Sequence, residues 1–354
     1  MRRIIRTIGL TMQALALSAA LGSVSAQQVT IAEGYSVTPD PSVTGDYKFA
    51  HGFGLIYAPM PITRVLGVME KKFPNAKIEW QNIFTTAQQR DAMLAGRLHF
   101  GSCTPGPYLQ SWDKGVDWKW VQVTSGFDGY LMVRSDGPKD ILEFIGTSKK
   151  LSPGPNTAQY FAAQELLHRA GKDVKALDRN FVNLPHPDAM QALIAGQLDG
   201  HWATADFAMR LTDQGMRQIA SFRKIFNALY AVGACALTKT INEHAAITRG
   251  YAEALRQTAA WMKANPQLAA EAMSKSVDNK VSSADFLKYM KSDIYDTYVA
   301  DADLQGQAKS MLALGGREPG GSLRTTVTRR APGDDPRCLD CLQHSRACGH
   351  AGGG

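Results

Sequence analysis

The sequence predicts an α/β fold of two similar lobes, each a mostly parallel sheet flanked by helices. The first observation behind this prediction is an internal repeat, because segment 91–115 returns without a gap as segment 191–215. The second is the alternation of strand-like and helix-like segments around both copies, which is typical of parallel sheets. The third is the recurrence of Thr, Pro and Gly where helices are expected to begin and end.

The two copies of the repeat carry identical residues at a constant offset. The matched pairs are Ala92/Ala192, Ala95/Ala195, Gly96/Gly196, Leu98/Leu198, Thr104/Thr204, Asp113/Asp213 and Gly115/Gly215. Each copy predicts a helix that ends at a glycine, then a short strand, then a polar turn that opens a second helix. Many α/β proteins contain this order by chance, but the identities outside the Ala-Gly core favour a true repeat.

The first residues have the features of a secretory signal peptide. Three arginines precede an apolar run at 8–21, and small residues at 24–26 provide a cleavage site near Ala26. A membrane anchor is the alternative, but polar residues interrupt the run and it is short for a span. Residues 1–26 are therefore expected to be removed on export, with the bacterial periplasm as the simplest compartment.

The net charge of +7 overstates the charge of the body of the chain. Residues 1–26 contribute three arginines and residues 317–354 contribute six arginines against four acids, which leaves +2 for residues 27–316. A near-neutral body argues against nucleic acid as a partner. Only Cys103 and Cys235 lie in that body, so no disulfide framework is predicted.

The first lobe is predicted to comprise residues 27–128 with 235–314. Its first part alternates strands and helices around a polar loop at 33–46. Strands are expected at 28–32, 48–56, 77–80, 98–101 and 120–123, and helices at 62–72, 85–94 and 104–112. A strand at 129–134 is expected to carry the chain into the second lobe.

The second lobe is predicted to comprise residues 129–234. Its helix at 158–170 is closed by Gly171 and carries an apolar stripe, and further strands are expected at 181–184, 219–223 and 229–237, the last as the return crossing. Helices then follow at 242–263, 267–275, 283–289 and 303–314. The first of these has one apolar face formed by Ile247, Tyr251, Leu255 and Met262.

The turn Ser102-Cys103-Thr104-Pro105 is the first candidate ligand site. Thr is a favoured N-cap and Pro favours the first helical position, so Thr104 is expected to begin a helix. Free amides at a helix N-terminus, together with the helix dipole, attract anions. Thr104 could instead only cap its own helix, but its recurrence at Thr204 favours a ligand role.

A second candidate is the Pro- and Gly-rich segment that ends in Asn156 and Thr157, at the start of the helix at 158–170. It is not a P-loop, because the Gly-Lys-Ser/Thr pattern is missing. Capping and ligand contact remain equal alternatives for Asn156. Trp202 could stack on a ligand or fill the space between lobes. Asp206 could pair with a ligand ammonium or serve as an acid in the first turn of a helix.

Three motifs in this order resemble those of the ABC-transporter substrate-binding proteins, nearest the nitrate, sulfonate and taurine group, which also holds binders of thiamine-pyrimidine precursors. The motifs are Gly154-Pro155-Asn156-Thr157, the Ala-Gly-x-Leu-Asp at 195–199, and the run from Tyr251-Ala-Glu-Ala-Leu to Lys263-Ala-Asn-Pro-Gln-Leu-Ala-Ala. The resemblance covers about residues 48–314. It implies a periplasmic-binding-protein-like fold of type II, with the ligand in a cleft between lobes that close about a hinge.

The resemblance also implies a small anionic solute as ligand, permease and ATPase subunits as partners, and a monomer with no catalytic residue, cofactor or metal. The expected ligand contacts, with the first-turn acid added, are Tyr57, Ala58, Ser102, Cys103, Thr104, Asn156, Thr157, Trp202, Thr204 and Asp206. The first lobe would offer hydroxyls and the second an aromatic surface. A ligand with one polar and one apolar end therefore fits better than nitrate.

Two other function classes stay open. A related fold is used by a thiamine-pyrimidine synthase, an enzyme with a clustered-cysteine iron motif, but the body of this chain has no such cluster. A receptor that presents its ligand to a membrane sensor would look the same in sequence. A neighbouring pair of permease and ATPase genes would favour the importer.

Residues 315–354 depart from the resemblance. They contain no aromatic residue and are rich in Gly, Arg and Pro, which cannot form a core. Cys338, Cys341, His344, Cys348 and His350 are of types that bind zinc, but a matching second Cys-x-x-Cys is missing. A disordered or aberrant tail is therefore expected, without a metal.

Overall fold

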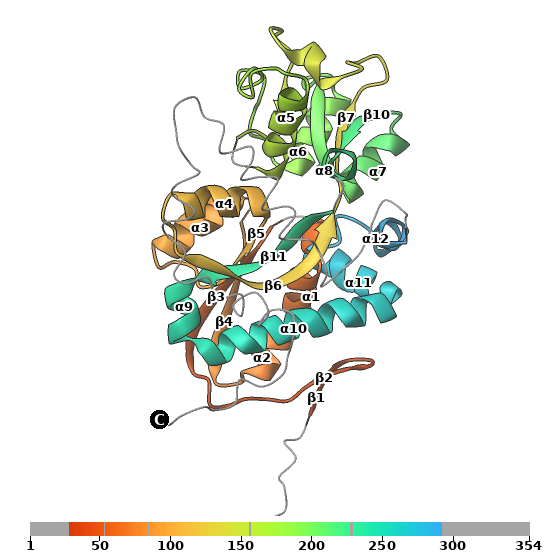
Figure 1. Ribbon diagram of the computed structural model, residues 1–354. Coiled ribbons are helices and arrows are strands. Elements are labelled where there is room, and N and C mark those ends of the chain that lie inside the picture. Colours follow the sequence, from red (N-terminus) through yellow and green to blue (C-terminus); the bar gives the residue numbers. More distant parts are fainter. Residues whose placement is uncertain (1–27, 53, 84, 156, 227–228, 292–354) are drawn as a thin grey trace, which may run out of the picture.

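The computed structural model describes residues 28–52, 54–83, 85–155, 157–226 and 229–291. The predicted signal peptide, the predicted helix at 303–314, the predicted tail at 315–354 and Asn156 lie outside these ranges. Within them, the elements form two groups that Figure 1 shows one above the other. We call these the lower group and the upper group.

The lower group contains the first copy of the repeat and the C-terminal helices. Its strands are β1 (Val29–Ala32), β2 (Tyr35–Val37), β3 (Gly45–His51), β4 (Ala76–Asn82), β5 (Gly101–Cys103), β6 (Trp118–Phe127) and β11 (Tyr230–Leu237). Its helices are η1 (Leu55–Tyr57), α1 (Pro59–Val65), α2 (Val68–Lys72), α3 (Thr86–Leu94), α4 (Pro105–Asp113), α9 (Thr238–Glu243), α10 (Ala245–Ala264), α11 (Pro266–Ser276) and α12 (Ser283–Met290).

The upper group contains the second copy of the repeat. Its strands are β7 (Gly129–Val133), β8 (Leu151–Ser152), β9 (Gly200–Thr204) and β10 (Arg217–Ser221). Its helices are η2 (Ile141–Phe144), α5 (Ala158–Arg169), α6 (His186–Ile194), α7 (Ala205–Asp213) and α8 (Phe222–Phe226).

Both groups combine parallel and antiparallel strand pairs. In the lower group β3 and β4 are parallel, Phe49 bridges Phe100 in parallel, and β11 pairs antiparallel with β5 and β6. In the upper group β8 and β9 are parallel, whereas β7 pairs antiparallel with β9 and β10. The predicted parallel order holds for strands that alternate with helices. Apart from the hairpin of β1 and β2, each antiparallel pair includes β7 or β11, at which the chain passes between the groups.

The crossings between the groups lie next to each other. β6 leads directly into β7 through Asp128, and β11 returns from the upper group to pair along its length with β6. The buried Asp128 carboxylate accepts a hydrogen bond from the backbone amide of Arg223 in α8, at 2.9 Å. This contact ties the outgoing crossing to the helix that precedes the return. The predicted lobe boundaries at 128/129 and 234/235 stay a prediction.

The repeat has the same local structure in both copies. α3, β5 and α4 of the first copy correspond to α6, β9 and α7 of the second. Gly96 and Gly196 follow the first helix of each copy with φ of 67° and 72°, where a side chain would be strained. The predicted order of helix, glycine, strand and helix is confirmed in both.

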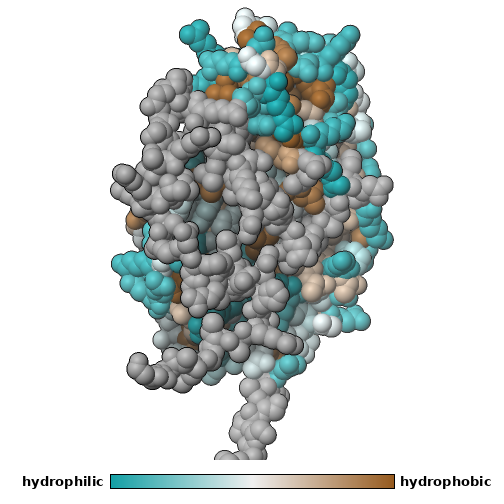
Figure 2. All heavy atoms as spheres, viewed as in Figure 1, coloured by the Kyte–Doolittle hydropathy of each residue, from teal (hydrophilic) through white to brown (hydrophobic). Residues whose placement is uncertain are grey.

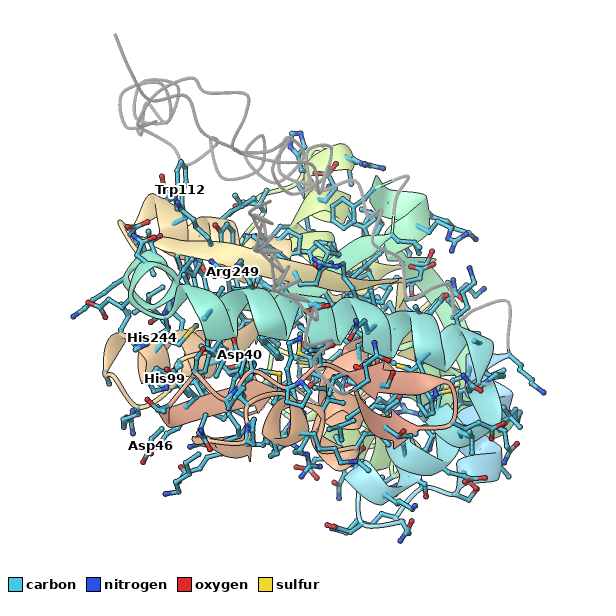
Figure 3. All side chains as sticks on the ribbon, turned by 90° about the horizontal axis from the view of Figure 1, so that it is seen from below. Asp40, Asp46, His99, Trp112, His244 and Arg249 are labelled. Atoms are coloured by element: carbon cyan, nitrogen blue, oxygen red, sulfur yellow. The ribbon has the colours of Figure 1, made fainter. Side chains whose placement is uncertain are left out.

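The long C-terminal helix packs with the face that its sequence predicts. Ile247, Tyr251, Leu255 and Met262 of α10 are all buried. Figure 3 shows α10 running across the underside of the molecule, with His244 before its first turn and His99 beside it. The two imidazole rings lie 5.8 Å apart, and the ring of Tyr47 contacts both.

Several predicted elements are wrong in extent. The predicted helix at 62–72 is divided into α1 and α2 by Gly67, whose φ of 62° ends the first helix. The predicted loop at 33–46 contains β2, which pairs with β1 in a hairpin. The strand predicted at 181–184 is reduced to a bridge between Phe181 and Leu151. The strand predicted at 219–223 gives way to α8 at Phe222.

On the face shown in Figure 2, hydrophilic residues gather along the top and sides of the molecule, with smaller hydrophobic areas between them. No helix in the described ranges is long and apolar enough to cross a membrane.

Candidate functional site

The candidate site is a cleft between the lower and the upper group. The empty space between its lining side chains is about 500 Å³, a volume that includes open solvent. The lower group contributes Ile56, Tyr57, Thr85, Thr86, Thr104 and Pro107, the upper group contributes Pro153, Thr157, Ala158, Gln159 and His186, and Phe127 lies at the crossing. The cleft thus joins residues that are far apart in the sequence.

Four helices begin at this cleft. Thr86, Ala158 and His186 are the first residues of α3, α5 and α6, and Thr104 is the N-cap of α4. The first amides of a helix have no partner within the helix and carry a partial positive charge. The convergence of four such ends favours a negatively charged ligand without a fixed cation.

Some cleft hydroxyls are already committed to the fold. The Thr85 hydroxyl accepts a hydrogen bond from the Gln88 amide at 3.1 Å, as part of a capping box. The Thr157 hydroxyl accepts from the Tyr160 amide at 3.2 Å and donates to the Gly154 carbonyl at 2.8 Å. Thr157 is therefore the N-cap of α5, and one lone pair of its oxygen remains for a ligand.

Other polar side chains of the cleft have no hydrogen-bond partner in the part of the chain that the structure describes. They are the side chains of Tyr57, Thr86, Thr104 and Gln159. Thr104 takes the N-cap position of α4 without capping it through its side chain. Burial raises the pKa of the Tyr57 phenol, which keeps it protonated as a donor. The cleft therefore contains uncommitted donors on both sides.

His186 is the ionisable group that the upper group places in the cleft. Its Nδ1 lies 3.2 Å from Nε2 of His201, and Nδ1 of His201 lies 3.3 Å from the Ser152 carbonyl. The carbonyl can only accept, so Nδ1 of His201 is the donor to it. Nε2 of His201 then accepts a hydrogen bond from the Nδ1–H of His186. Nε2 of His186 then carries a lone pair. Burial lowers the pKa of His186 to about 4, so the ring is neutral near neutral pH.

The two groups approach closely beside the cleft. A Cβ added to Gly106 in α4 would lie 2.4 Å from the ring of Phe161 in α5. The Gly106 amide donates to the Tyr230 hydroxyl at 2.8 Å. A glycine is required here because any side chain would push α4 and α5 apart.

Of the residues expected from the sequence to contact ligand, Tyr57, Thr104 and Thr157 line the cleft. Asn156 is outside the described ranges. Ala58, Ser102 and Cys103 are fully buried and do not line it. Ser102 is held by Gln89, whose side-chain oxygen accepts the Ser102 hydroxyl proton at 3.1 Å.

The candidate residues of the second copy, Trp202, Thr204 and Asp206, are instead buried inside the protein. Trp202 is fully buried and packs against Phe222 with ring centroids 5.5 Å apart. Thr204 is also fully buried and donates to the Asp206 carboxylate at 2.7 Å. Asp206 in turn accepts a hydrogen bond from the backbone of Leu55 in η1. Asp206 thus connects the two groups, and none of these three residues lines the cleft.

Sequence reasoning missed the roles of Thr86, Gln159 and His186 in the cleft. A signal for two of them was available, since Thr86 and His186 are separated by the same offset as the repeat. Extending the repeat a few residues towards the N-terminus would have paired the starts of α3 and α6.

The lining residues include no lysine, arginine or carboxylate among the residues that the structure describes. No group of three or more metal-ligating side chains occurs in these ranges either. The described lining offers a ligand helix ends, hydroxyls, an amide and an imidazole.

No family model and no curated protein matches the sequence. Solved structures do match the fold. The periplasmic aliphatic sulphonate-binding protein of Escherichia coli has a TM-score of 0.57 at 16% identity, covering 75% of this chain and 85% of that one. The alkanesulfonate-binding protein of Xanthomonas axonopodis pv. citri, bound to MOPS, has a TM-score of 0.63 at 14% identity, covering 76% and 90%.

A ligand-binding component of an ABC-type import system from Staphylococcus aureus, with zinc bound, has a TM-score of 0.58 at 14% identity and covers 77% of this chain and 91% of that one. Identities at this level show the fold and not the ligand. The chain has the fold of the periplasmic substrate-binding proteins of ABC importers.

Proposed function

We propose that this protein is the periplasmic substrate-binding component of an ABC importer and binds a small organic anion, a sulfonate or a carboxylate, in the cleft. Its partners are the permease and ATPase subunits of that importer. The protein acts as a monomer, after removal of residues 1–26, and releases its ligand unchanged, without a cofactor.

The observation that carries this proposal is the convergence of four helix N-termini on one cleft lined by uncommitted donors. An anionic group in the cleft would meet the positive ends of these helices and the hydroxyls of Thr86 and Thr104. A cationic ligand would meet the same helix ends unfavourably, with no carboxylate among the described lining residues to compensate.

The apolar part of the lining supports an organic anion in preference to nitrate. Ile56, Phe127 and Pro153 lie beside the polar residues of the cleft. Burying a hydrocarbon group against them would contribute about 25 cal/mol for each Å² removed from water. A ligand with one anionic and one apolar end uses both parts of the lining.

Binding couples to closure because the donors come from both groups. Thr86 and Thr104 belong to the lower group, and Gln159 belongs to the upper group. Only a ligand that contacts both groups stabilises the closed arrangement. The free energy of ligand binding therefore favours closure. The paired crossings at β6 and β11 provide the hinge.

A thermal-shift screen of the purified protein tests the proposal. The panel contains alkanesulfonates including MOPS, taurine, aromatic carboxylates, nitrate, pyrimidines and organic ammonium ions. Organic anions are expected to raise the melting temperature, and chromatography of the incubated ligand is expected to show no consumption. Stabilisation by ammonium ions alone, or turnover of the ligand, would reject the proposed function.

A further inference from the structure

Helices α3 and α5 begin at the cleft, one in each group, with backbone amides that no acceptor occupies. In each helix the hydroxyl of the N-cap threonine accepts a hydrogen bond from the third amide, which leaves the first two. Each pair lies at the positive end of its helix dipole. Within the described ranges, the amides without an acceptor are those of Thr86 and Ala87 in α3 and of Ala158 and Gln159 in α5.

Buried polar side chains at these two helix starts point independently to a ligand. The side chain of Gln159 is only 6% exposed and lines the cleft, yet its amide has no hydrogen-bond partner among the residues that the structure describes. The hydroxyl of Thr86, in a residue that is 7% exposed, is in the same condition on the other side. Burying such groups without a partner is unfavourable. A ligand that accepts from both would restore the hydrogen bonds that burial removes.

The start of α4 differs, because none of its first three residues has an N–H to offer. Pro105 and Pro107 are the first and third residues of this helix and have no amide hydrogen. The amide of Gly106 between them donates to the Tyr230 hydroxyl at 2.8 Å. α4 therefore contributes its dipole to the cleft but no hydrogen bond from these residues.

The cleft wall at the start of α4 is largely apolar. Pro107 and Phe127 both line the cleft, and the ring of Phe127 packs edge-on against that of Tyr230 with centroids 5.6 Å apart. Since Tyr230 also holds Gly106, Phe127 lies on the α4 side. The Thr104 hydroxyl is the polar group that this helix start keeps for a ligand. Figure 1 shows α3 and α4 next to each other, below α5.

We propose that the charged head of the organic anion binds to the free amides of α3 and α5, and that its hydrocarbon part lies against Pro107 and Phe127 at the start of α4. The inference rests on the proposed function. A sulfonate or carboxylate head has oxygen atoms enough to accept from both helix starts at once. The head, supported by the Thr104 hydroxyl, therefore joins the two groups, and the hydrocarbon part adds apolar contact.

Proline substitution at the first residue of each helix tests this orientation. Proline is favoured at that position and removes the N–H without breaking the helix. The preceding residues, Thr85 and Thr157, have the extended backbone that a following proline requires. Ala158→Pro is compared with Ala158→Val, and Thr86→Pro with Thr86→Val, because valine adds bulk and keeps the N–H. Melting temperatures without ligand verify that each variant folds.

The probes are 1-propanesulfonate, 1-hexanesulfonate and hexanoate, titrated calorimetrically into the full chain. A158P is expected to bind each probe about ten- to hundredfold more weakly than A158V, and T86P more weakly than T86V by a similar factor, since each loses a hydrogen bond to a charged group. The factor should be the same for both sulfonates, which share one head. Equal affinities within each pair of variants, or a loss seen only with hexanesulfonate, would overturn the inference.

Pro105→Ala returns an N–H to the first residue of α4 and is the control for the helix that the head avoids. Its affinity for the probes is expected to equal that of the wild type. Tighter binding by P105A would place the head at α4 and overturn the inference. A wild type that binds none of the three probes would reject the proposed function as well, whereas the proline variants can reject the orientation alone.

Discussion

Thr86 and His186 each lie five residues before a copy of the repeat, as first residues of α3 and α6, and both line the same cleft. The duplication therefore supplies two opposed helix ends for one ligand. It does so with different chemistry, since one end carries a hydroxyl and the other an imidazole held by His201.

Replacing Thr104 by Val is expected to weaken ligand binding by about 1 to 3 kcal/mol, because the hydroxyl has no partner in the described ranges and is free to bind the ligand. Val keeps the shape of the side chain, so the melting temperature without ligand should change little. Calorimetric titration measures the loss. Thr212→Val, on the outer helix α7, is the matched control, and equal affinities of T104V and T212V would remove Thr104 from the site.

Replacing Thr157 by Ala is expected to cost about 0.5 to 2 kcal/mol of stability, because α5 loses the hydroxyl that caps the Tyr160 amide. Thr157→Ser keeps the oxygen and should recover most of that loss. Denaturant unfolding measures both variants. If T157A and T157S were equally stable, the cap would contribute nothing.

Anion binding is expected to strengthen as the pH falls from about 7 towards 4. The pKa of His186 is lowered to about 4 in the free protein, and an anion nearby raises it, so binding takes up a proton. A sulfonate is the suitable probe because its own charge does not change in this range. Titrations at several pH values should show the slope in the wild type and lose it in H186Q. The same slope in both proteins would assign the proton elsewhere.

Stability without ligand is expected to fall over the same pH range. His51 and His186 are buried, and burial lowers the pKa of each to about 4, whereas the unfolded chain takes up protons near 6.5. The unfolded state therefore binds more protons between these values. The stabilisation is complete above about 6.5 and is lost progressively towards 4, by up to roughly 3 kcal/mol per histidine. Denaturant unfolding from neutral to acid pH measures this loss. His51→Gln should make the decline shallower, and a flat profile in the wild type would contradict the account.

The sequence predicts the repeat well because each copy is specified locally. Gly96 and Gly196 end their helices through a backbone conformation that only glycine adopts easily. The apolar face of α10 is likewise readable from the spacing of Ile247 and Tyr251. Local signals of this kind depend on a few adjacent residues, so a single sequence contains them.

The site was predictable only in part, because lining depends on packing between distant segments. Thr104 and Thr204 are matched residues of the repeat, yet Thr104 faces the cleft and Thr204 is tied to Asp206 beneath η1. Trp202 packs against Phe222, which lies twenty residues later in the sequence. Whether an equivalent position faces the cleft depends on packing partners such as Phe222 and Leu55, which lie outside the repeat.

The central claim is that one organic anion binds to both groups across the cleft. Calorimetric titration of the best-stabilising anion against wild type, T104V, Q159A and the double variant tests it most directly, since Thr104 belongs to the lower group and Gln159 to the upper group. The account predicts one-to-one binding to the wild type, weaker binding to each single variant, and a combined loss that departs from the sum because both residues act on one closed complex. Unchanged affinity in both single variants would contradict it.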